Sequence, residues 1–420
     1  MKILVVGSGG REHAIVRALA RSPQRPELLC APGNAGIAAD ARCVAVAADD
    51  LQGICDLARA EHVDLVVVGP EVPLVAGLVD ELRDCGVEVF GPSMAAARLE
   101  GSKAYSKEVM EAAGVPTAAW SRVSTVADGM AAIASYPVVV KADGLAAGKG
   151  VVSAAGEDEA REALTDMLER VAFGKTDVVV EEFLDGEEVS LLALCDGVRA
   201  VPLAPAQDYK RIGDGDAGPN TGGMGAYSPV PGWDAERARA TALSVHQPIV
   251  DELARRGTPF HGVLYAGLMM TADGPRVLEY NVRFGDPETQ AVLPRLRTDL
   301  VDVLRATIEP GGLEGLELEW DGRWAVTLVL ASSGYPASAS HGDVISGLAA
   351  VGAGVEVTHA GTARSGDDVV TAGGRVLNVT ALGESPAAAR DAAYAGADQI
   401  TFDGRQLRRD IAQRAVERVA

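Results

Sequence analysis

Two oxygen-bearing side chains, Glu279 and Asn281, end a strand-like segment and could together hold a metal ion. They are two positions apart, so their side chains share one face of a strand. A carboxylate and an amide oxygen suit Mg²⁺, which takes few protein ligands and keeps substrate phosphates as the others. Arg283 falls on the same face if the strand continues, and its guanidinium could hold a phosphoryl oxygen. The alternative is an exposed polar strand face.

A glycine-rich loop bracketed by lysines occupies residues 141–150 (KADGLAAGKG). Lys141 ends one strand, and Lys149 lies just before the next strand resumes. The loop differs from a Walker loop, which has G-x-x-x-x-G-K-[ST] and leads into a helix. It is one residue short and is followed by glycine and a strand. We therefore predict a mobile flap that closes over phosphates, with a simple flexible hairpin as the alternative.

Acidic residues surround an apolar pair in the segment 181–188 (EEFLDGEE). A strand edge at this point could offer backbone N–H and C=O groups to an adenine. Glu188 could then accept hydrogen bonds from ribose hydroxyls. Taken alone, the segment favours a solvated acidic hairpin.

Three glycine-containing loops follow strands in the first hundred residues, at 7–12 (GSGGRE), 32–36 (PGNAG) and 69–71 (GPE). The first loop opens a helix, whose N-terminal N–H groups and dipole favour an anion. Glu12 replaces the third glycine of a dinucleotide fingerprint, and the second strand ends without an acid. This pattern favours a phosphate or sugar-phosphate site over a dinucleotide site, with a plain turn as the alternative. Ligands of open α/β sheets bind beyond the carboxyl ends of strands, so the three loops suggest one shared pocket.

Composition narrows the class of protein. The chain has 420 residues, of which 48% are hydrophobic and 23% charged, so it can bury a sizeable core and is not disordered. Lys and Arg number 38 against 59 Asp and Glu, a net charge of −21 that argues against nucleic-acid or anionic-membrane binding. The five cysteines form no C-x-x-C motif, and no apolar run approaches the ~18 residues of a spanning helix. We expect a cytoplasmic protein.

The elements that must position these residues begin with alternating strands and helices. Apolar runs predict strands at 3–6, 28–31, 43–46, 63–68 and 87–90, separated by helical stretches that include 50–60 and 74–84. This rhythm predicts a parallel sheet with helices on both faces. Further along, we predict helices at 103–113, 157–171, 234–256 and 385–397, and strands at 137–142, 151–154, 178–183, 261–270, 275–281, 325–331, 355–360 and 375–381. Residues 204–232 are predicted to form one long loop.

Taken together, the motifs resemble the ATP-grasp superfamily and, within it, the phosphoribosylamine–glycine ligase family. The matching segments run in order along the chain and include GSGGREHA (7–14), APGNAG (31–36), GPS…LEGSKA (91–104), KADGLAAGKGV (141–151), EEFLDGEE (181–188), QDYKRIGDGDAGPNTGGMGAYSP (207–229), EYNVRFGDPETQ (279–290) and GGRVLNVTALG (373–383). The resemblance implies an α/β protein with an N-terminal parallel α/β domain (1–100), a central ATP-grasp body (101–312, flap about 118–186) and a small β-rich C-terminal domain (313–420). It implies that glycine is joined to 5-phosphoribosylamine through glycyl phosphate at the expense of ATP.

The resemblance also implies roles for individual residues. ATP would be bound by Lys103, Lys141, Lys149, Glu181, Glu182, Phe183, Leu184 and Glu188, and Mg²⁺ or Mn²⁺ by Glu279 and Asn281. Arg283 and Lys141 would act in catalysis, and the substrates would be held by Gly9, Gly10, Asn34, Glu71, Asp208, Lys210, Arg283 and Asp286. Within the last group, we expect the Gly9 and Gly10 amides at the sugar phosphate, Glu71 or Asn34 at the ribose hydroxyls, and glycine nearer Asp208 and Arg283.

Three departures and two rival functions remain. The family often has Cys in place of Val282 and His in place of Tyr209. Many ATP-grasp enzymes also have an acid on the strand that corresponds to Tyr265–Met269, where this chain, like the ligase family in general, has none, so a second Mg²⁺ held fully by the protein is not expected from the resemblance. Another ATP-grasp ligase is disfavoured by the 207–229 segment, and a non-catalytic nucleotide sensor by the intact lysines and metal pair. We expect small-molecule substrates only, and a monomer or weak dimer.

Overall fold

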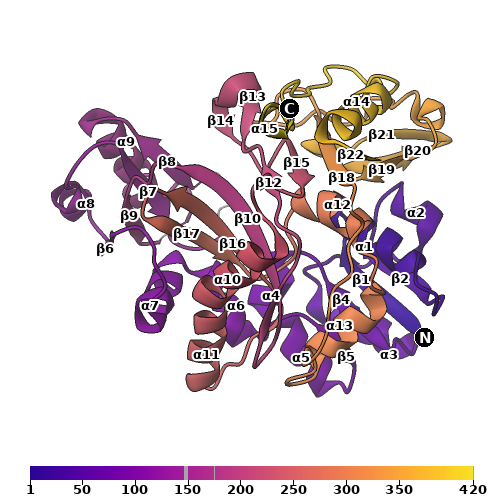
Figure 1. Cartoon of the computed structure of the whole chain (residues 1–420), viewed down its shortest axis with the longest axis horizontal. Coiled ribbons are helices and arrows are strands. Elements are labelled where there is room, and N and C mark those ends of the chain that lie inside the picture. The colour runs from indigo at the N-terminus through magenta and orange to yellow at the C-terminus, as the bar shows by residue number, and fades with distance from the viewer. Residues whose placement is uncertain (146–149, 175, 420) are drawn as a thin grey trace.

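The computed structural model describes residues 1–145, 150–174 and 176–419. Figure 1 shows an N-terminal sheet at the lower right, a C-terminal sheet above it, and a long central sheet that leads to a smaller subdomain at the upper left. No helix within these described ranges combines the length and the apolar character needed to cross a membrane.

The N-terminal part is a five-stranded, wholly parallel sheet of order β3-β2-β1-β4-β5. Its strands are β1 (Lys2–Gly7), β2 (Glu27–Pro32), β3 (Arg42–Cys43), β4 (Leu65–Val68) and β5 (Glu88–Phe90), and its helices are α1 (Gly10–Ala20), α2 (Ile37–Asp40), α3 (Leu51–Ala60), α4 (Glu71–Ala76) and α5 (Leu78–Asp84). Along β1, Ile3 and Val5 pack into one core cluster and Leu4 and Val6 into another. Both faces of the sheet are therefore buried, as predicted.

The central part contains two antiparallel four-stranded sheets. The smaller sheet, β6-β9-β7-β8, is made of β6 (Trp120–Val123), β7 (Val138–Ala142), β8 (Val151–Ala154) and β9 (Val178–Glu182), with α8 (Val126–Ala132) and α9 (Glu157–Leu168) packed against it. The larger, β11-β10-β16-β17, is made of β10 (Glu187–Asp196), β11 (Ala200–Pro202), β16 (His261–Thr271) and β17 (Gly274–Asn281). The helices α6 (Met94–Gly101), α7 (Lys103–Ala113), α10 (Ala235–Val245), α11 (Gln247–Arg255), α12 (Glu288–Val292) and α13 (Leu300–Ile308) complete this region.

The C-terminal part is built on a five-stranded sheet of order β12-β15-β18-β22-β19. The elements are β12 (Gln207–Asp208), β15 (Gly225–Ser228), β18 (Trp324–Ala331), β19 (Val355–His359) and β22 (Arg375–Gly383), with the hairpins β13 (Arg211–Gly213)–β14 (Ala217–Asn220) and β20 (Thr362–Ser365)–β21 (Asp368–Thr371) and the helices α14 (Pro386–Ala397) and α15 (Gln413–Val419). The sheet therefore combines strands from the 204–232 segment with strands from the end of the chain.

Several local predictions were wrong. Residues 204–232 are not one loop, because β12 to β15 lie there and β15 pairs with β18, about a hundred residues away. The helix predicted over 234–256 is broken at His246, two residues before Pro248, whose ring cannot continue the hydrogen-bond ladder. The helix predicted over 74–84 is broken at Gly77, which has a φ of 99°. The long central strand β10 was not predicted at all.

Candidate active site

A pocket of about 480 Å³ lies where the three parts of the chain meet. Its wall includes Arg11 and Glu71 from the N-terminal part, residues from both central sheets, and Arg375 from β22. This volume is typical of small-molecule sites. The predicted site residues that line it are Glu71, Lys103, Lys141, Glu181, Glu182, Phe183, Leu184, Glu188, Asp208, Lys210, Glu279, Asn281, Arg283 and Asp286.

Three predicted site residues that the structure describes, Gly9, Gly10 and Asn34, are not part of this wall. A fourth predicted residue, Lys149, lies outside the described residues. The Gly9 amide donates to the buried Glu12 carboxylate at 2.6 Å, so the helix N-terminus already holds an anion from the chain itself. A Cβ at Gly10 would meet Asn378, which packs the loop against β22. Asn34 donates to the carbonyl oxygens of Ser8 and His359 and accepts from two loop amides.

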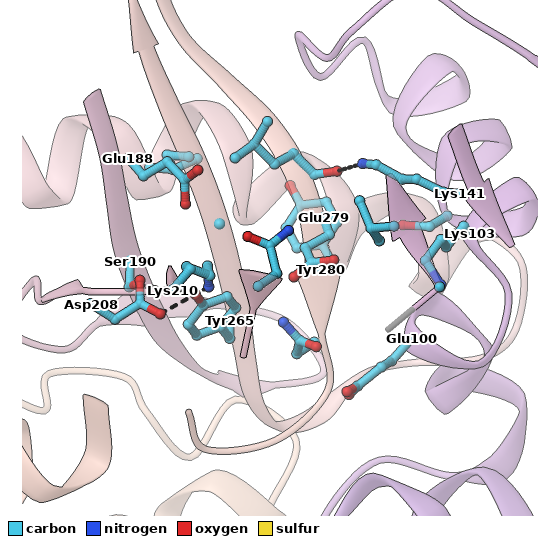
Figure 2. Close-up of a pocket in the computed structure, with 18 of the residues that line it drawn as sticks. Glu100, Lys103, Lys141, Glu188, Ser190, Asp208, Lys210, Tyr265, Glu279 and Tyr280 are labelled. Atoms are coloured by element: carbon cyan, nitrogen blue, oxygen red, sulfur yellow. Dashed lines mark hydrogen bonds and ion pairs between the residues drawn. The ribbon is translucent and has the colours of Figure 1, made fainter. Parts of the chain in front are cut away.

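The predicted metal pair lies at the end of β17, where Glu279 pairs with Gly267 and Asn281 with Tyr265 across the sheet. Gly267 has no side chain, which leaves space beside the carboxylate. Burial alone raises the pKa of Glu279, but neighbouring cations, Lys210 first, outweigh it and lower the pKa. Figure 2 shows Glu279 between Lys103 and Lys141 on one side and Lys210 on the other. Glu279 is therefore ionised before any ligand binds.

The donor set fits a divalent ion that keeps open positions. No group of three or more His, Cys, Asp or Glu side chains that could hold a metal is found among the residues the structure describes. A closed structural zinc site would need such a group. One carboxylate and one amide oxygen on the same strand suit Mg²⁺ or Mn²⁺, whose remaining ligands would be phosphates and water.

Lysines from two elements form the cationic wall of the pocket. Lys103 begins α7, where Ser102 caps the helix, and its Nζ donates to the Gly144 carbonyl at 2.8 Å. Lys141, at the end of β7, donates to the Glu181 carboxylate at 2.9 Å and to the Leu278 carbonyl at 3.2 Å. Burial lowers the pKa of Lys103, partly offset by Glu279. Both lysines line the pocket and give this wall its positive charge.

Arg283 and two acids form an ion cluster at the N-terminal side of the pocket. The Arg283 guanidinium lies 3.2 Å from Glu71 and 3.3 Å from Glu100. Burial raises the pKa of Glu100 to about 7, while Arg283 acts in the opposite direction. Burial also tends to raise the pKa of Glu71, but Arg283 and Arg11 bring it below its usual value. Glu71 thus carries a full charge beside Arg283.

A second cluster lies opposite, on β10, β12 and α12. The Lys210 ammonium is 3.0 Å from the Asp208 carboxylate, as Figure 2 shows. Ser190 donates to Glu288 at 2.9 Å and lies 3.0 Å from the Tyr265 hydroxyl. Burial is the main cause that raises the pKa of Glu288, and the negative charge of Asp208 adds to it. Several acids therefore share one lysine, an arrangement that can accept the ammonium group of a small amino acid.

The predicted adenine-binding segment follows β9. That strand ends at Glu182, so Phe183 and Leu184 lie beyond its last residue, and both line the pocket. The Glu182 amide donates to the Ala119 carbonyl at 2.9 Å, and the Ala119 amide donates to the Glu182 carboxylate at 3.0 Å. Phe183 is 44% exposed, which leaves its ring available to a ligand. Glu181 pairs with both β6 and β7 and Glu182 with β7, so the backbone left to face a ligand is the stretch beyond β9, and its contact with an adenine stays a prediction.

The structure also brings residues to the pocket that sequence reasoning missed, namely Arg11, Glu100, Lys107, Ser190, Tyr265, Glu288 and Arg375. For one of them a sequence signal existed, because Lys107 is four positions after Lys103 on a predicted helix and must share its face. Arg375 had no local signal. Its guanidinium donates to the carbonyl oxygens of Gly222 and Asp286, far away in the chain.

Comparison with known proteins first identifies the class. The chain shares its fold with the biotin carboxylase domain of a 2-oxoglutarate carboxylase from Hydrogenobacter thermophilus (TM-score 0.70, 17% identity, 97% of this chain and 91% of that one). The model of the phosphoribosylglycinamide synthetase ATP-grasp (A) domain matches residues 101–289. The fold and the pocket are therefore those of an ATP-grasp protein.

Further matches identify the family. The N- and C-domain models of phosphoribosylglycinamide synthetase match residues 1–100 and 325–414. Proteins named phosphoribosylamine–glycine ligase are 51% identical in Xanthomonas axonopodis (100% of this chain, 99% of the relative) and 53% identical in Streptomyces coelicolor (99% of each). The crystal structure of that ligase from Thermotoga maritima has a TM-score of 0.84 and 34% identity, covering 98% of this chain and all of that one. The chain belongs to the phosphoribosylglycinamide synthetase family.

Proposed function

We propose that this chain joins glycine to 5-phosphoribosylamine with the hydrolysis energy of ATP, giving glycinamide ribonucleotide, ADP and phosphate in purine biosynthesis. The observation that carries the proposal is one pocket in which Lys103, Lys141, Lys210 and Arg283 surround the Glu279 carboxylate. Such a site suits phosphoryl transfer, which needs positioning and charge neutralisation rather than a protein nucleophile. The full-length similarity to phosphoribosylamine–glycine ligases supports the choice of substrates.

The reaction divides into two displacements. An oxygen of the glycine carboxylate attacks the γ-phosphorus of ATP, the bond to the β,γ-bridging oxygen breaks, and ADP leaves with that electron pair. The amine nitrogen of phosphoribosylamine then attacks the carbonyl carbon of glycyl phosphate. The bond from that carbon to the phosphate oxygen breaks, phosphate leaves, and the nitrogen loses a proton. Water would hydrolyse the acyl phosphate, so the pocket must exclude it.

We assign the nucleotide to the central side of the pocket. Lys103 and Lys141 neutralise the phosphates, the 181–184 segment contacts the adenine and Glu188 binds the ribose. Glu279 and Asn281 would hold Mg²⁺ or Mn²⁺, and the bound ion would supply charge neutralisation at the transferred phosphoryl group. Lys149 would add to the phosphate contacts from the flap.

We assign the two substrates to the remaining clusters. Glycine presents its ammonium group to Asp208 and its carboxylate to Arg283, which faces the γ-phosphate. Phosphoribosylamine lies toward the N-terminal part, with Glu71 on its ribose hydroxyls. The Gly9 amide already donates to Glu12, and Asn34 is hydrogen-bonded within its own loop and to His359, so Gly9 is less available to the sugar phosphate and Asn34 to the ribose hydroxyls. Asp286 and Lys210 support this side of the pocket.

The deciding experiment measures ADP release with ATP, Mg²⁺ and glycine, with and without phosphoribosylamine. We expect sustained release only with both substrates. Release that ignores phosphoribosylamine and responds to another amine would indicate a different ATP-grasp ligase. A protein that binds ADP but never turns over would be a nucleotide sensor. The proposed domain limits, 1–100, 101–312 and 313–420, need a separate test. Chains truncated at these limits should each fold on their own.

A further inference from the structure

One buried carboxylate in the pocket is shared by two lysines. The Glu181 Oε2 atom lies 2.9 Å from the Lys141 ammonium and 3.1 Å from the Lys107 ammonium. The side chains of Glu181 and Lys107 are each only 2% exposed. The other carboxylate oxygen, Oε1, is buried and has no hydrogen-bond partner among the described residues. Among the residues that the structure describes, this acid is therefore neutralised by the two lysines.

The two lysines differ in how they are held. Lys107 also donates to the Thr117 hydroxyl at 2.7 Å, and Thr117 in turn donates to the Val277 carbonyl at 2.6 Å. This chain of hydrogen bonds fixes the Lys107 ammonium between α7 and β17. Within the described ranges, the second partner of Lys141 is the backbone carbonyl of Leu278, beside the metal pair and at a longer distance of 3.2 Å. Lys141 is therefore the lysine that can turn toward a ligand.

A phosphate that binds Lys141 would draw it away from Glu181. Without a second cation, the acid would become a buried, unpaired charge, which is among the most costly states inside a protein. We propose that Lys107 is a positioning residue that keeps Glu181 neutralised and so releases Lys141 to the nucleotide phosphates. The inference deepens the proposed function, because it rests on the assignment of the nucleotide to this pocket.

Lys107 carries its charge under ordinary conditions. Burial lowers the pKa of its ammonium to about 8, against the opposing effect of Glu181. The charged groups that face it are Glu181 from β9, Lys141 from β7 and Glu279 from β17. At pH 7 the ammonium is therefore protonated, and above about pH 8 it loses its charge.

Magnesium–ADP titration by calorimetry tests the inference without requiring turnover. We expect Lys107→Met to weaken ADP binding at least tenfold, because Lys141 must then leave Glu181 unpaired. Lys107→Arg keeps a cation and should stay within threefold of the wild type. The double variant Lys107→Met/Glu181→Gln should bind ADP more tightly than Lys107→Met and as tightly as Glu181→Gln alone, since the unpaired charge is gone. Glu108→Gln, on the exposed face of the same helix, serves as the matched control.

The outcomes separate this inference from the proposed function. A wild-type protein that does not bind ADP contradicts the nucleotide site itself. If the wild type binds ADP and the ADP affinity of Lys107→Met is within twofold of the wild-type value, the proposed role of Lys107 is overturned. Recovery in the double variant distinguishes charge pairing from simple packing, which predicts further loss. If Lys107→Met does not fold, the test compares Glu181→Gln with the double variant. Once the Glu181 charge is removed, Lys107 has nothing to neutralise, so the two variants should bind ADP with equal affinity.

The pH dependence gives a second readout. ADP affinity of the wild type should fall as the pH rises through about 8, and this step should be absent in the double variant. A step of the same size in both proteins would contradict the inference.

Discussion

The metal pair gives the sharpest test of the proposed site, through Glu279→Gln. The substitution keeps the size of the side chain and removes one negative charge from the end of β17. In the wild type, Lys210, Lys141 and Lys103 lower the pKa of this carboxyl group against the effect of burial. The variant therefore loses the charged metal ligand and leaves these lysines less well compensated. We expect folding to be retained and turnover to collapse.

The expected loss follows from the charge removed. Two unit charges about 4 Å apart interact by about 4 kcal/mol at an effective dielectric constant of about 20. At about 1.4 kcal/mol per tenfold, that corresponds to nearly three orders of magnitude in kcat/KM. The neutral amide oxygen remains a weak ligand, so a raised metal concentration should restore a part of the binding but not the full rate.

Two measurements check the prediction. Steady-state ADP release gives kcat/KM, and titration of Mn²⁺ in the presence of ADP, followed by electron paramagnetic resonance, gives the metal affinity. The matched control is Asp273→Asn, which removes one charge from the exposed turn of the same hairpin. An activity within tenfold of the wild type, or an unchanged Mn²⁺ affinity, would refute the assignment of Glu279 as a metal ligand.

Three further predictions concern the remaining parts of the chain. Glu71→Ala should raise the KM for phosphoribosylamine and leave that for ATP unchanged; the reverse pattern in steady-state kinetics would show that the N-terminal side of the pocket is misassigned. Arg375→Met removes charged hydrogen bonds to Gly222 and Asp286; if the equivalent of one such bond, about 1.5–3 kcal/mol, is lost from the transition state, kcat/KM should fall roughly 10- to 100-fold. Wild-type rates would contradict a role of the C-terminal sheet in the site. Burial lowers the pKa of His246 to about 4 in the folded protein. Between about pH 6.5 and pH 4 the unfolded chain therefore binds more protons than the folded chain, and the free energy of unfolding falls with the pH by up to about 3 kcal/mol. Urea unfolding of His246→Gln should lack this part of the acid sensitivity, and parallel pH curves for the two proteins would argue against it.

Local periodicity was enough to predict the elements that hold much of the site. The apolar runs of the N-terminal sheet were found from sequence because strands buried on both faces are almost wholly apolar. Lys103 was placed at the start of a helix, and Glu279 and Asn281 on one strand face, by short-range geometry alone. The missed strand β10 is a run of buried residues from Val189 to Cys195, apolar except for Ser190, which periodicity cannot assign to strand or helix.

Tertiary structure decided which of these residues meet. The segment 204–232 looked like a loop because glycine and proline break its pattern, yet β15 gains its order from β18, with Ala226 opposite Thr327. The Glu12 carboxylate that accepts from the Gly9 amide is three positions away, at the N3 position of a capping box, so a local spacing rule could have predicted this contact. The pairing of β15 with β18 had no such signal, because it depends on which distant elements the folded chain brings together.

The sequence by itself determined the residue types, the strand faces and, through its motifs, the family. Only the folded chain decided that Arg283 lies against Glu71, 212 positions away, and that Lys107 and Lys141 share the Glu181 carboxylate. The physical reason is that the position of a residue along its strand or helix sets the face on which its side chain lies, whereas the partner of that side chain is set by the packing of distant elements. The electrostatic state of the pocket follows from those distant contacts, since burial and neighbouring charges shift each pKa.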